Sequence, residues 1–167
     1  MAAKNDITAD RVRELLEYDP ATGLFEWRVA RANVKVGQRT GCLNSGGYRY
    51  IGIDNRLYKA HRLAWLYVYG RWPANDIDHI NGVRDDNRIA NLREATRSQN
   101  IANARGTRKN KSGFKGAYFL KRERKWLACI TVCGKRQHIG LFTTAAGAHA
   151  AYVKAAKHHF GEFARTE

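Results

Sequence analysis

Apolar and polar positions follow two different periods in the first 70 residues of the chain. A helical period begins after Thr8, a typical helix-capping residue, and stops before Pro20. A strand period recurs in short segments bounded by turn residues such as Asp54-Asn55. These segments are residues 24–28, 48–53 and 57–58. A second helical stretch at residues 60–69 ends at Gly70 and is expected to supply core to this region.

Residues 76–100 are more polar, and their pattern predicts a strand, a loop, a second strand and the start of a helix. The first strand, at residues 77–80, ends at Asn81-Gly82, a strong signal for a tight turn. Residues 91–93 are expected to pair back on it. Thr96 and Gln99 have the spacing of a capping box, so the helix begins there and carries Asn100 in its first turn.

From Phe114 onward the pattern predicts a sheet followed by one helix. Strands are expected at residues 115–119, 125–132 and 135–142. Thr143 or Thr144 then caps an alanine-rich helix that runs to Phe160 and ends at Gly161. A three-stranded antiparallel meander packed on one helix follows, with one face of the sheet open.

The change of pattern predicts an α+β protein of two domains. Residues 1–104 form the N-terminal region, whose polar motif occupies about 76–104, and residues 113–167 form the second domain. Between them, residues 105–112 are polar and basic without apolar periodicity, as expected of a linker.

Charge is distributed unevenly between these regions. The chain has 30 Lys and Arg residues against 15 Asp and Glu, a net charge of +15. Residues 1–104 carry 16 bases and 12 acids, whereas residues 105–167 carry 14 bases and 3 acids, a net charge of +11. Such an excess favours nucleic acid as the partner. Because no long apolar run or export signal is present, we expect a cytoplasmic protein that binds no membrane.

Four residues of the polar motif suit the hydrolysis of phosphodiester bonds. His79, with an ordinary pKa of about 6.5, is the candidate general base. The side-chain carbonyl of Asn91 is expected to accept the imidazole N–H and so to determine which ring nitrogen faces the water. Asp78 and Asn100 offer oxygen ligands to one hard divalent cation, Mg²⁺ in the first place and Mn²⁺ in the second.

At these residues the chain resembles the HNH endonucleases, particularly the compact enzymes of phages and mobile introns. In that family an Asp-His pair ends the first strand, an Asn follows in the second, and a His or Asn in the helix completes the metal site. The resemblance implies a ββα-metal nuclease module in which Asp78 and Asn100 bind the cation, His79 is the base and Asn91 orients it. The terminal Asn, as in the intron-homing branch, leaves open whether one strand or both are cut. Monomer and homodimer are equally open.

The C-terminal pattern resembles the apetala-two or ethylene-response-factor DNA-binding domain, which is also found attached to HNH nucleases. The resemblance rests on residues 112–116, 125–130, 139–145 and 150–156. It implies that the open sheet face lies in a DNA major groove. The residues expected to contact DNA are Lys115, Arg122, Arg124, Trp126, Arg136 and His138. Arg93 and Arg97 are further candidates, close to the scissile phosphate.

The sequence therefore predicts a metal-dependent endonuclease of double-stranded DNA, of the phage or mobile-element homing type. A non-catalytic DNA-binding protein, such as a repressor, is the alternative. RNA binding is a second alternative, which competition between duplex DNA and RNA would distinguish. His61, at the start of an apolar helix, is expected to be a packed or capping residue.

Overall fold

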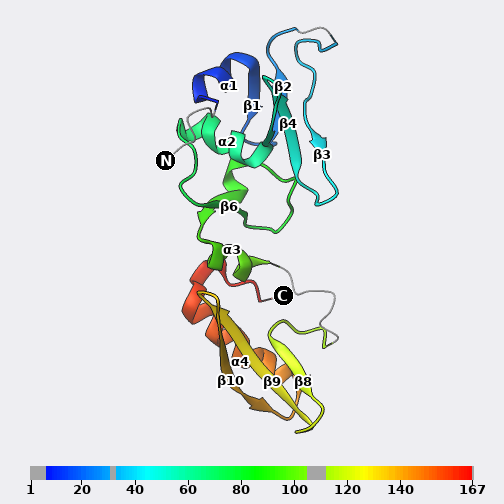
Figure 1. Cartoon of the computed structure of the whole chain (residues 1–167), viewed down its shortest axis with the longest axis vertical. Coiled ribbons are helices and arrows are strands. Elements are labelled where there is room, and N and C mark those ends of the chain that lie inside the picture. Colours follow the sequence, from blue (N-terminus) through cyan, green and yellow to red (C-terminus); the bar gives the residue numbers. More distant parts are fainter. Residues whose placement is uncertain (1–6, 31–32, 105–111, 167) are drawn as a thin grey trace. The chain divides into compact units, whose positions relative to one another are not determined.

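The computed structural model describes residues 7–30, 33–104 and 112–166 of the chain (Figure 1). Internal contacts divide the chain into two compact units, Met1–Glu94 and Ala95–Glu167, which are described one at a time. Within the described residues, four α-helices combine with small antiparallel sheets. None of the helices in this described part is long and apolar enough to cross a membrane.

The first unit begins with helix α1 (Ala9–Leu15) and the hairpin of β1 (Leu16–Asp19) and β2 (Leu24–Trp27). The side chain of Thr8 caps α1 by accepting a hydrogen bond from the backbone N–H of Arg11 at 3.2 Å, as the sequence predicts. Leu16 pairs with Trp27 in the hairpin. Gly23, with φ +75°, makes the turn between the strands.

A three-stranded sheet and a helix complete the core of the first unit. The sheet has the order β3 (Cys42–Leu43), β4 (Arg49–Ile53) and β5 (Arg56–Lys59). Asp54 and Asn55 both have positive φ, as a two-residue hairpin turn of type I′ requires. Helix α2 (Ala60–Tyr69) follows and ends at Gly70 in the left-handed region. Helix α1, the β1–β2 hairpin, β4 and α2 supply the most deeply buried large apolar side chains of the first unit, among them Val12, Leu16, Phe25, Ile51, Ile53 and Leu63.

The polar motif forms a small sheet with a long connection. Strand β6 (Asp76–His79) and strand β7 (Leu92–Ala95) lie in one two-stranded sheet, and the short 3₁₀-helix η1 (Ile89–Asn91) precedes β7. Asn91 therefore ends a helical turn and does not start the strand, which is a small departure from the prediction. The backbone N–H of Ile80 donates to the carbonyl oxygen of Asn91 at 2.9 Å, so the two strand ends remain together.

The second unit contains helix α3 (Arg97–Asn103), which a capping box between Thr96 and Gln99 starts as predicted. It also contains the sheet of β8 (Ala117–Leu120), β9 (Lys125–Val132) and β10 (Lys135–Phe142), in the order β10-β9-β8. Helix α4 (Ala145–Phe160) and the 3₁₀-helix η2 (Gly161–Phe163) are the last two elements of the second unit. Helix α4 packs on one face of this sheet (Figure 1).

Alanines bring α4 close to the sheet. Ala117 of β8, Ala128 of β9 and Ala148 of α4 are all fully buried and form one cluster. A β-bulge between His138 and Gly140 turns the intervening Ile139 toward the same clusters. Tyr152 and Phe160 fill the remaining volume on the helix side, as expected.

Contacts assign α3 to the second unit, whereas the sequence analysis placed the boundary after it. The Nζ of Lys115 donates to the carbonyl oxygens of Ala102 at 2.5 Å and Ala104 at 2.6 Å, at the C-terminal end of α3. Ala102 also belongs to the core cluster that contains Ile130 and Tyr152. These contacts are distant in sequence, so no local pattern predicts them. The expected linker lies outside the described residues except for Ser112.

Candidate functional site

Strand β6 places two ionisable side chains next to each other in the interior of the first unit. Asp78 is 4% exposed and His79 is 5% exposed. Such groups lose their hydration on folding and are stable there only when other polar groups replace it. The partners of these two residues therefore define the site.

His79 receives its side-chain partner from the loop between β6 and η1. Its Nε2 lies 3.2 Å from the Oδ1 of Asn87, which is 1% exposed. The Nδ2 of Asn87 donates to the backbone carbonyl of Asp85 at 3.2 Å, so the Oδ1 faces the imidazole. An amide oxygen only accepts, so this contact favours the tautomer in which Nε2 carries the hydrogen.

Burial favours the neutral form of His79. Loss of hydration is the main cause that lowers the pKa of His79 below its ordinary value, while the hydrogen bond to Asn87 and the charge of Asp78 act in the opposite direction. A lowered pKa leaves the imidazole unprotonated at neutral pH, which is the state that a general base needs.

Asn91 has a different contact from the one predicted. Its Oδ1 accepts the backbone N–H of Asn81 at 3.0 Å, and its Nδ2 donates to the Oδ1 of Asn81 at 3.1 Å and to the carbonyl of Asp86 at 2.8 Å. The predicted hydrogen bond from the imidazole N–H of His79 to the Oδ1 of Asn91 is therefore wrong, because the Oδ1 of Asn87 lies at Nε2 instead. Asn91 thus binds the connecting loop at Asn81 and Asp86, and acts on His79 only through that loop.

Ion pairs fasten the same loop to the neighbouring sheet and to itself. Arg49 of β4 pairs with both carboxylate oxygens of Asp85 at 2.8 Å each, in a partly buried fork. The carboxylate of Asp86 accepts hydrogen bonds from the side chains of Arg88 and Asn81. These bonds lower the pKa of Asp86 to about 2, and the bond from Arg88 is the main cause. The loop that carries Asn87 is thus tied to β4 and cross-linked within itself.

The β1–β2 hairpin supports this loop from the other side. The hydroxyl of Tyr18 donates to the backbone carbonyl of Asn87 at 2.7 Å, and burial raises the pKa of Tyr18 well above its ordinary value. At the hairpin turn, a Cβ on Gly23 would lie 2.4 Å from the backbone nitrogen of Arg88 and 2.5 Å from the carbonyl carbon of Asn87. Only glycine allows so close an approach.

Asp78 pairs with Arg93 of β7. The Nε and Nη2 of Arg93 each lie 3.0 Å from the same carboxylate oxygen, Oδ2. The side chains of Arg93 and Asp78 are only 14% and 5% exposed, so this is a buried ion pair. The structure places Arg93 on a carboxylate, whereas the sequence analysis expected it on a phosphate. Arg97, the other arginine expected there, is exposed at the start of α3 in the second unit.

A second histidine lies against His79. The rings of His61 and His79 meet edge to face with centroids 5.0 Å apart, and the ring of Tyr48 lies 5.4 Å from that of His61. His61 is 4% exposed, in agreement with the prediction of a packed residue, and burial is the first cause that lowers its pKa to about 3. Its Nδ1 has no hydrogen-bond partner among the described residues. The apolar pattern of α2 predicts the burial of His61 but not its contact with His79.

The residues present suit a cation that needs few protein ligands. No group of three His, Cys, Asp or Glu residues in the described part of the chain is arranged to hold a metal by itself. Mg²⁺ commonly binds one or two carboxylates and completes its shell with water and phosphate oxygens. Asp78 supplies a buried carboxylate of this kind, already paired with a positive group. Asn100, the other expected ligand, is half-buried on α3 in the second unit.

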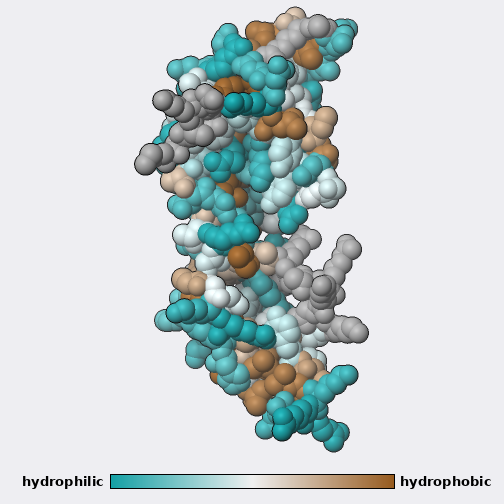
Figure 2. All heavy atoms as spheres, viewed as in Figure 1, coloured by the Kyte–Doolittle hydropathy of each residue, from teal (hydrophilic) through white to brown (hydrophobic). Residues whose placement is uncertain are grey.

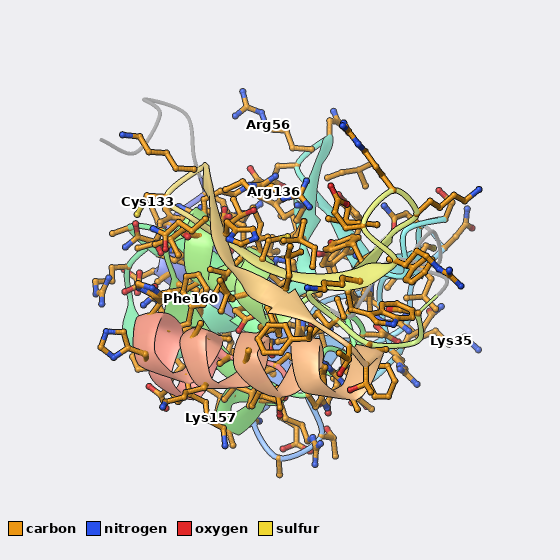
Figure 3. All side chains as sticks on the ribbon, turned by 90° about the horizontal axis from the view of Figure 1, so that it is seen from below. Lys35, Arg56, Cys133, Arg136, Lys157 and Phe160 are labelled. Carbon is orange, nitrogen blue, oxygen red and sulfur yellow. The ribbon has the colours of Figure 1, made fainter. Side chains whose placement is uncertain are left out.

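The sheet of the second unit presents basic side chains on the face opposite α4. Arg136 and His138 of β10 are exposed, and the guanidinium of Arg136 lies 5.2 Å from the ring centroid of Tyr118. Figure 3 shows Arg136 extending away from α4, whereas Lys157 points outward from the other side of that helix. Arg122 and Arg124 are exposed at the β8–β9 turn, beyond the end of the sheet.

The same open face contains an apolar row. Tyr118, Leu127 and Leu141 are opposite one another on the three strands, and Tyr118 and Leu141 are each 43% exposed. Figure 2 shows hydrophobic side chains gathered over this sheet, bordered by hydrophilic ones. We call Tyr118, Leu127, Arg136, His138 and Leu141 the open face of the sheet from here on.

Two residues that the sequence analysis placed on DNA lie elsewhere. Trp126 packs against the alanine cluster on the α4 side of the sheet, because it lies two residues before Ala128 in β9 and so shares the covered face with it. Lys115 is half-buried against the end of α3, and burial lowers its pKa to about 8. The prediction that Trp126 and Lys115 lie on the open face is therefore wrong, and contact of either residue with DNA stays a prediction.

The comparison with protein families gives one match. Residues 58–102 match the family described as HNH endonuclease. The matching segment begins in β5, ends in α3 and contains the candidate residues Asp78, His79, Asn91 and Asn100. It supports an HNH nuclease that acts on DNA, and hence a hydrolase. No curated protein and no solved structure matches the chain.

Proposed function

We propose that this protein is a metal-dependent endonuclease that hydrolyses phosphodiester bonds in double-stranded DNA. The observation that carries the proposal is the buried imidazole of His79, held through Nε2 by Asn87 and adjacent to the buried carboxylate of Asp78. This arrangement lies inside the segment that matches the HNH endonucleases. A histidine fixed in a neutral tautomer next to a potential cation ligand is what metal-assisted hydrolysis requires.

In the proposed reaction His79 removes a proton from the attacking water, while Asn87 keeps the ring in position. Asp78 and Asn100 would bind one divalent cation, Mg²⁺ in the first place and Mn²⁺ in the second, in the ββα-metal arrangement that the family resemblance implies. When bound, such a cation neutralises the charge that develops on the phosphate and on the leaving oxygen. Asn91 keeps the loop folded so that Asn87 stays against His79.

The second unit is proposed to hold the DNA. Arg136 and His138 on the open face of the sheet, and Arg122 and Arg124 beside it, offer exposed basic groups to phosphates and base edges. The net charge of +11 over residues 105–167 supports this assignment. A role as a homing enzyme of a phage or mobile element, and the resemblance to the apetala-two domain, belong to the same proposal.

Cleavage of supercoiled plasmid tests the proposal. With Mg²⁺ the wild type should convert the plasmid to an open-circular or linear form, and the product form tells whether one strand or both are cut. His79→Ala should lose at least about a hundredfold in rate, the usual contribution of a general base. EDTA should stop the reaction.

The alternative is a DNA-binding protein without catalytic activity, which the basic charge of the second unit favours on its own. In that case the wild type would bind plasmid and leave it intact with Mg²⁺ and with Mn²⁺. A wild type that cuts only with metal, together with a binding but inactive His79→Ala, would exclude it.

A further inference from the structure

The ion pair between Asp78 and Arg93 has a consequence for the binding of metal. One carboxylate oxygen, Oδ2 of Asp78, accepts both the Nε and the Nη2 of Arg93 at 3.0 Å. The pair is almost completely shielded from solvent, so salt and water screen it weakly. A positive group is thus already bound to the carboxylate that the cation would use.

We infer that Arg93 is a positioning residue that competes with the divalent cation for the carboxylate of Asp78. This inference rests on the proposed function, in which Asp78 is a metal ligand. Arg93 keeps the buried carboxylate neutralised and oriented while no cation is bound, at the expense of metal affinity. A cation that binds Asp78, at either carboxylate oxygen, comes close to the guanidinium on Oδ2, and the two positive charges repel each other.

The arrangement of the other charges supports a dedicated role for Arg93. Arg88 lies in the same connecting segment, but it pairs with Asp86 at the surface, where its side chain is 52% exposed. Arg49 pairs with Asp85 and fastens the loop to β4. Arg93 pairs with the carboxylate next to His79.

Metal binding to the protein without DNA tests the inference. Binding of Mn²⁺ alone is measured by electron paramagnetic resonance for the wild type, Arg93→Met, Arg93→Lys, Asp78→Asn and the control Arg88→Met. Arg93→Met should bind Mn²⁺ roughly tenfold more tightly than the wild type, because the competing charge is gone and the carboxylate remains. Arg93→Lys and Arg88→Met should stay within about twofold of the wild type, because the first keeps a competing charge and the second removes a charge that is screened by solvent.

Opposite outcomes separate the inference from the proposed function. If Asp78→Asn loses Mn²⁺ binding while Arg93→Met binds no more tightly than the wild type, the competition is refuted and Asp78 stays a ligand. If Asp78→Asn binds Mn²⁺ as the wild type does, Asp78 is no ligand and the proposed metal site itself fails. A merely structural role of Arg93 would weaken Mn²⁺ binding in Arg93→Met and would not strengthen it.

Arg93→Met leaves a buried carboxylate without its partner, so a second measurement uses the wild-type fold. The Nε–H resonance of Arg93 is followed by nuclear magnetic resonance during a titration with Mg²⁺. It should shift or broaden with the same midpoint as Mg²⁺ binding measured by calorimetry, and remain unchanged in Asp78→Asn. An Arg93 resonance that stays in place while Mg²⁺ saturates the wild type would overturn the inference.

Discussion

The polar side chains of the two units are placed in opposite ways. In the first unit Asp78, His79 and Asn87 are buried, and each is held by a named partner. In the second unit Arg136 and His138 lie exposed on a sheet whose other face is closed by alanines and α4. A group that moves a proton must be fixed and partly dehydrated, whereas a group that binds phosphates must reach into solvent. Under the proposed function, the buried residues of the first unit move the proton, and the exposed basic residues of the second unit bind the DNA.

The largest effect is expected at the hairpin that supports the buried site. Gly23→Ala should destabilise the first unit by about 3 kcal/mol or more, because the new Cβ would overlap the backbone of Asn87 and Arg88. Gly37→Ala is the matched control, since Gly37 has the same positive φ and nothing within 4 Å of a Cβ. It should cost only about 1 kcal/mol of backbone strain. Equal losses in urea unfolding followed by tryptophan fluorescence would show that the contact with the loop is unimportant.

The next effect is expected at Asn87. Asn87→Ala removes the acceptor of the His79 Nε2–H and should slow cleavage by roughly 10- to 100-fold with little change in DNA affinity, as for a loss of 1–3 kcal/mol. Arg71→Met, which removes an exposed charge of the same unit from a long ion pair with Glu94, serves as the control for the fold. Single-turnover cleavage and equilibrium DNA binding measure the two effects. A rate within twofold of the wild type would mean that Asn87 does not orient His79.

His61 gives a smaller effect that depends on pH. Its folded pKa of about 3 lies below the ordinary 6.5, so the unfolded chain takes up a proton first as the pH falls. The stability from neutral His61 is complete above pH 6.5 and is lost toward pH 3, by roughly 1 kcal/mol at pH 5.5. His61→Phe keeps a buried ring and removes this titration. The melting temperature of the wild type should therefore fall more between pH 7.5 and 5.5 than that of His61→Phe, and equal falls would contradict the account.

The smallest effect is expected on the open face of the sheet. Arg136→Ala should weaken DNA binding by several-fold and reduce the dependence of affinity on salt by about one counterion. Lys157→Ala removes the same charge from the far side of α4 and should change binding much less (Figure 3). Titration of labelled duplex at several salt concentrations measures both variants. Equal losses in the two would indicate that overall charge, and not this face, binds the DNA.

The sequence predicted the elements well because their periods and caps are local. Helix α2, strand β9 and strand β10 have the expected bounds, and Thr8 and Thr96 cap helices as their neighbours suggest. The loop between β6 and η1 has no period, so its sequence cannot distinguish whether Asn87 or Asn91 turns toward His79. That choice depends on distant partners, such as Tyr18.

The error at Trp126 has a similar cause. Strand β9 is apolar on both faces, so alternation alone does not tell which face the helix covers. The signal that was available is size, since Ala128 shares a face with Trp126 and the helix that packs there is rich in alanine. The burial of Lys115 had no such signal, because it follows from contacts with the end of α3.

Binding and cleavage measured together on one plasmid test the central claim most directly. His79→Ala and Arg136→Ala are compared with the wild type at Mg²⁺ saturation, first at low protein concentration and then with all DNA bound. The account predicts that His79→Ala binds like the wild type and cuts at least about a hundredfold more slowly. Arg136→Ala should bind more weakly but cut at nearly the wild-type rate once bound. The account is contradicted if His79→Ala cuts at the wild-type rate, or if Arg136→Ala at saturation is as inactive as His79→Ala.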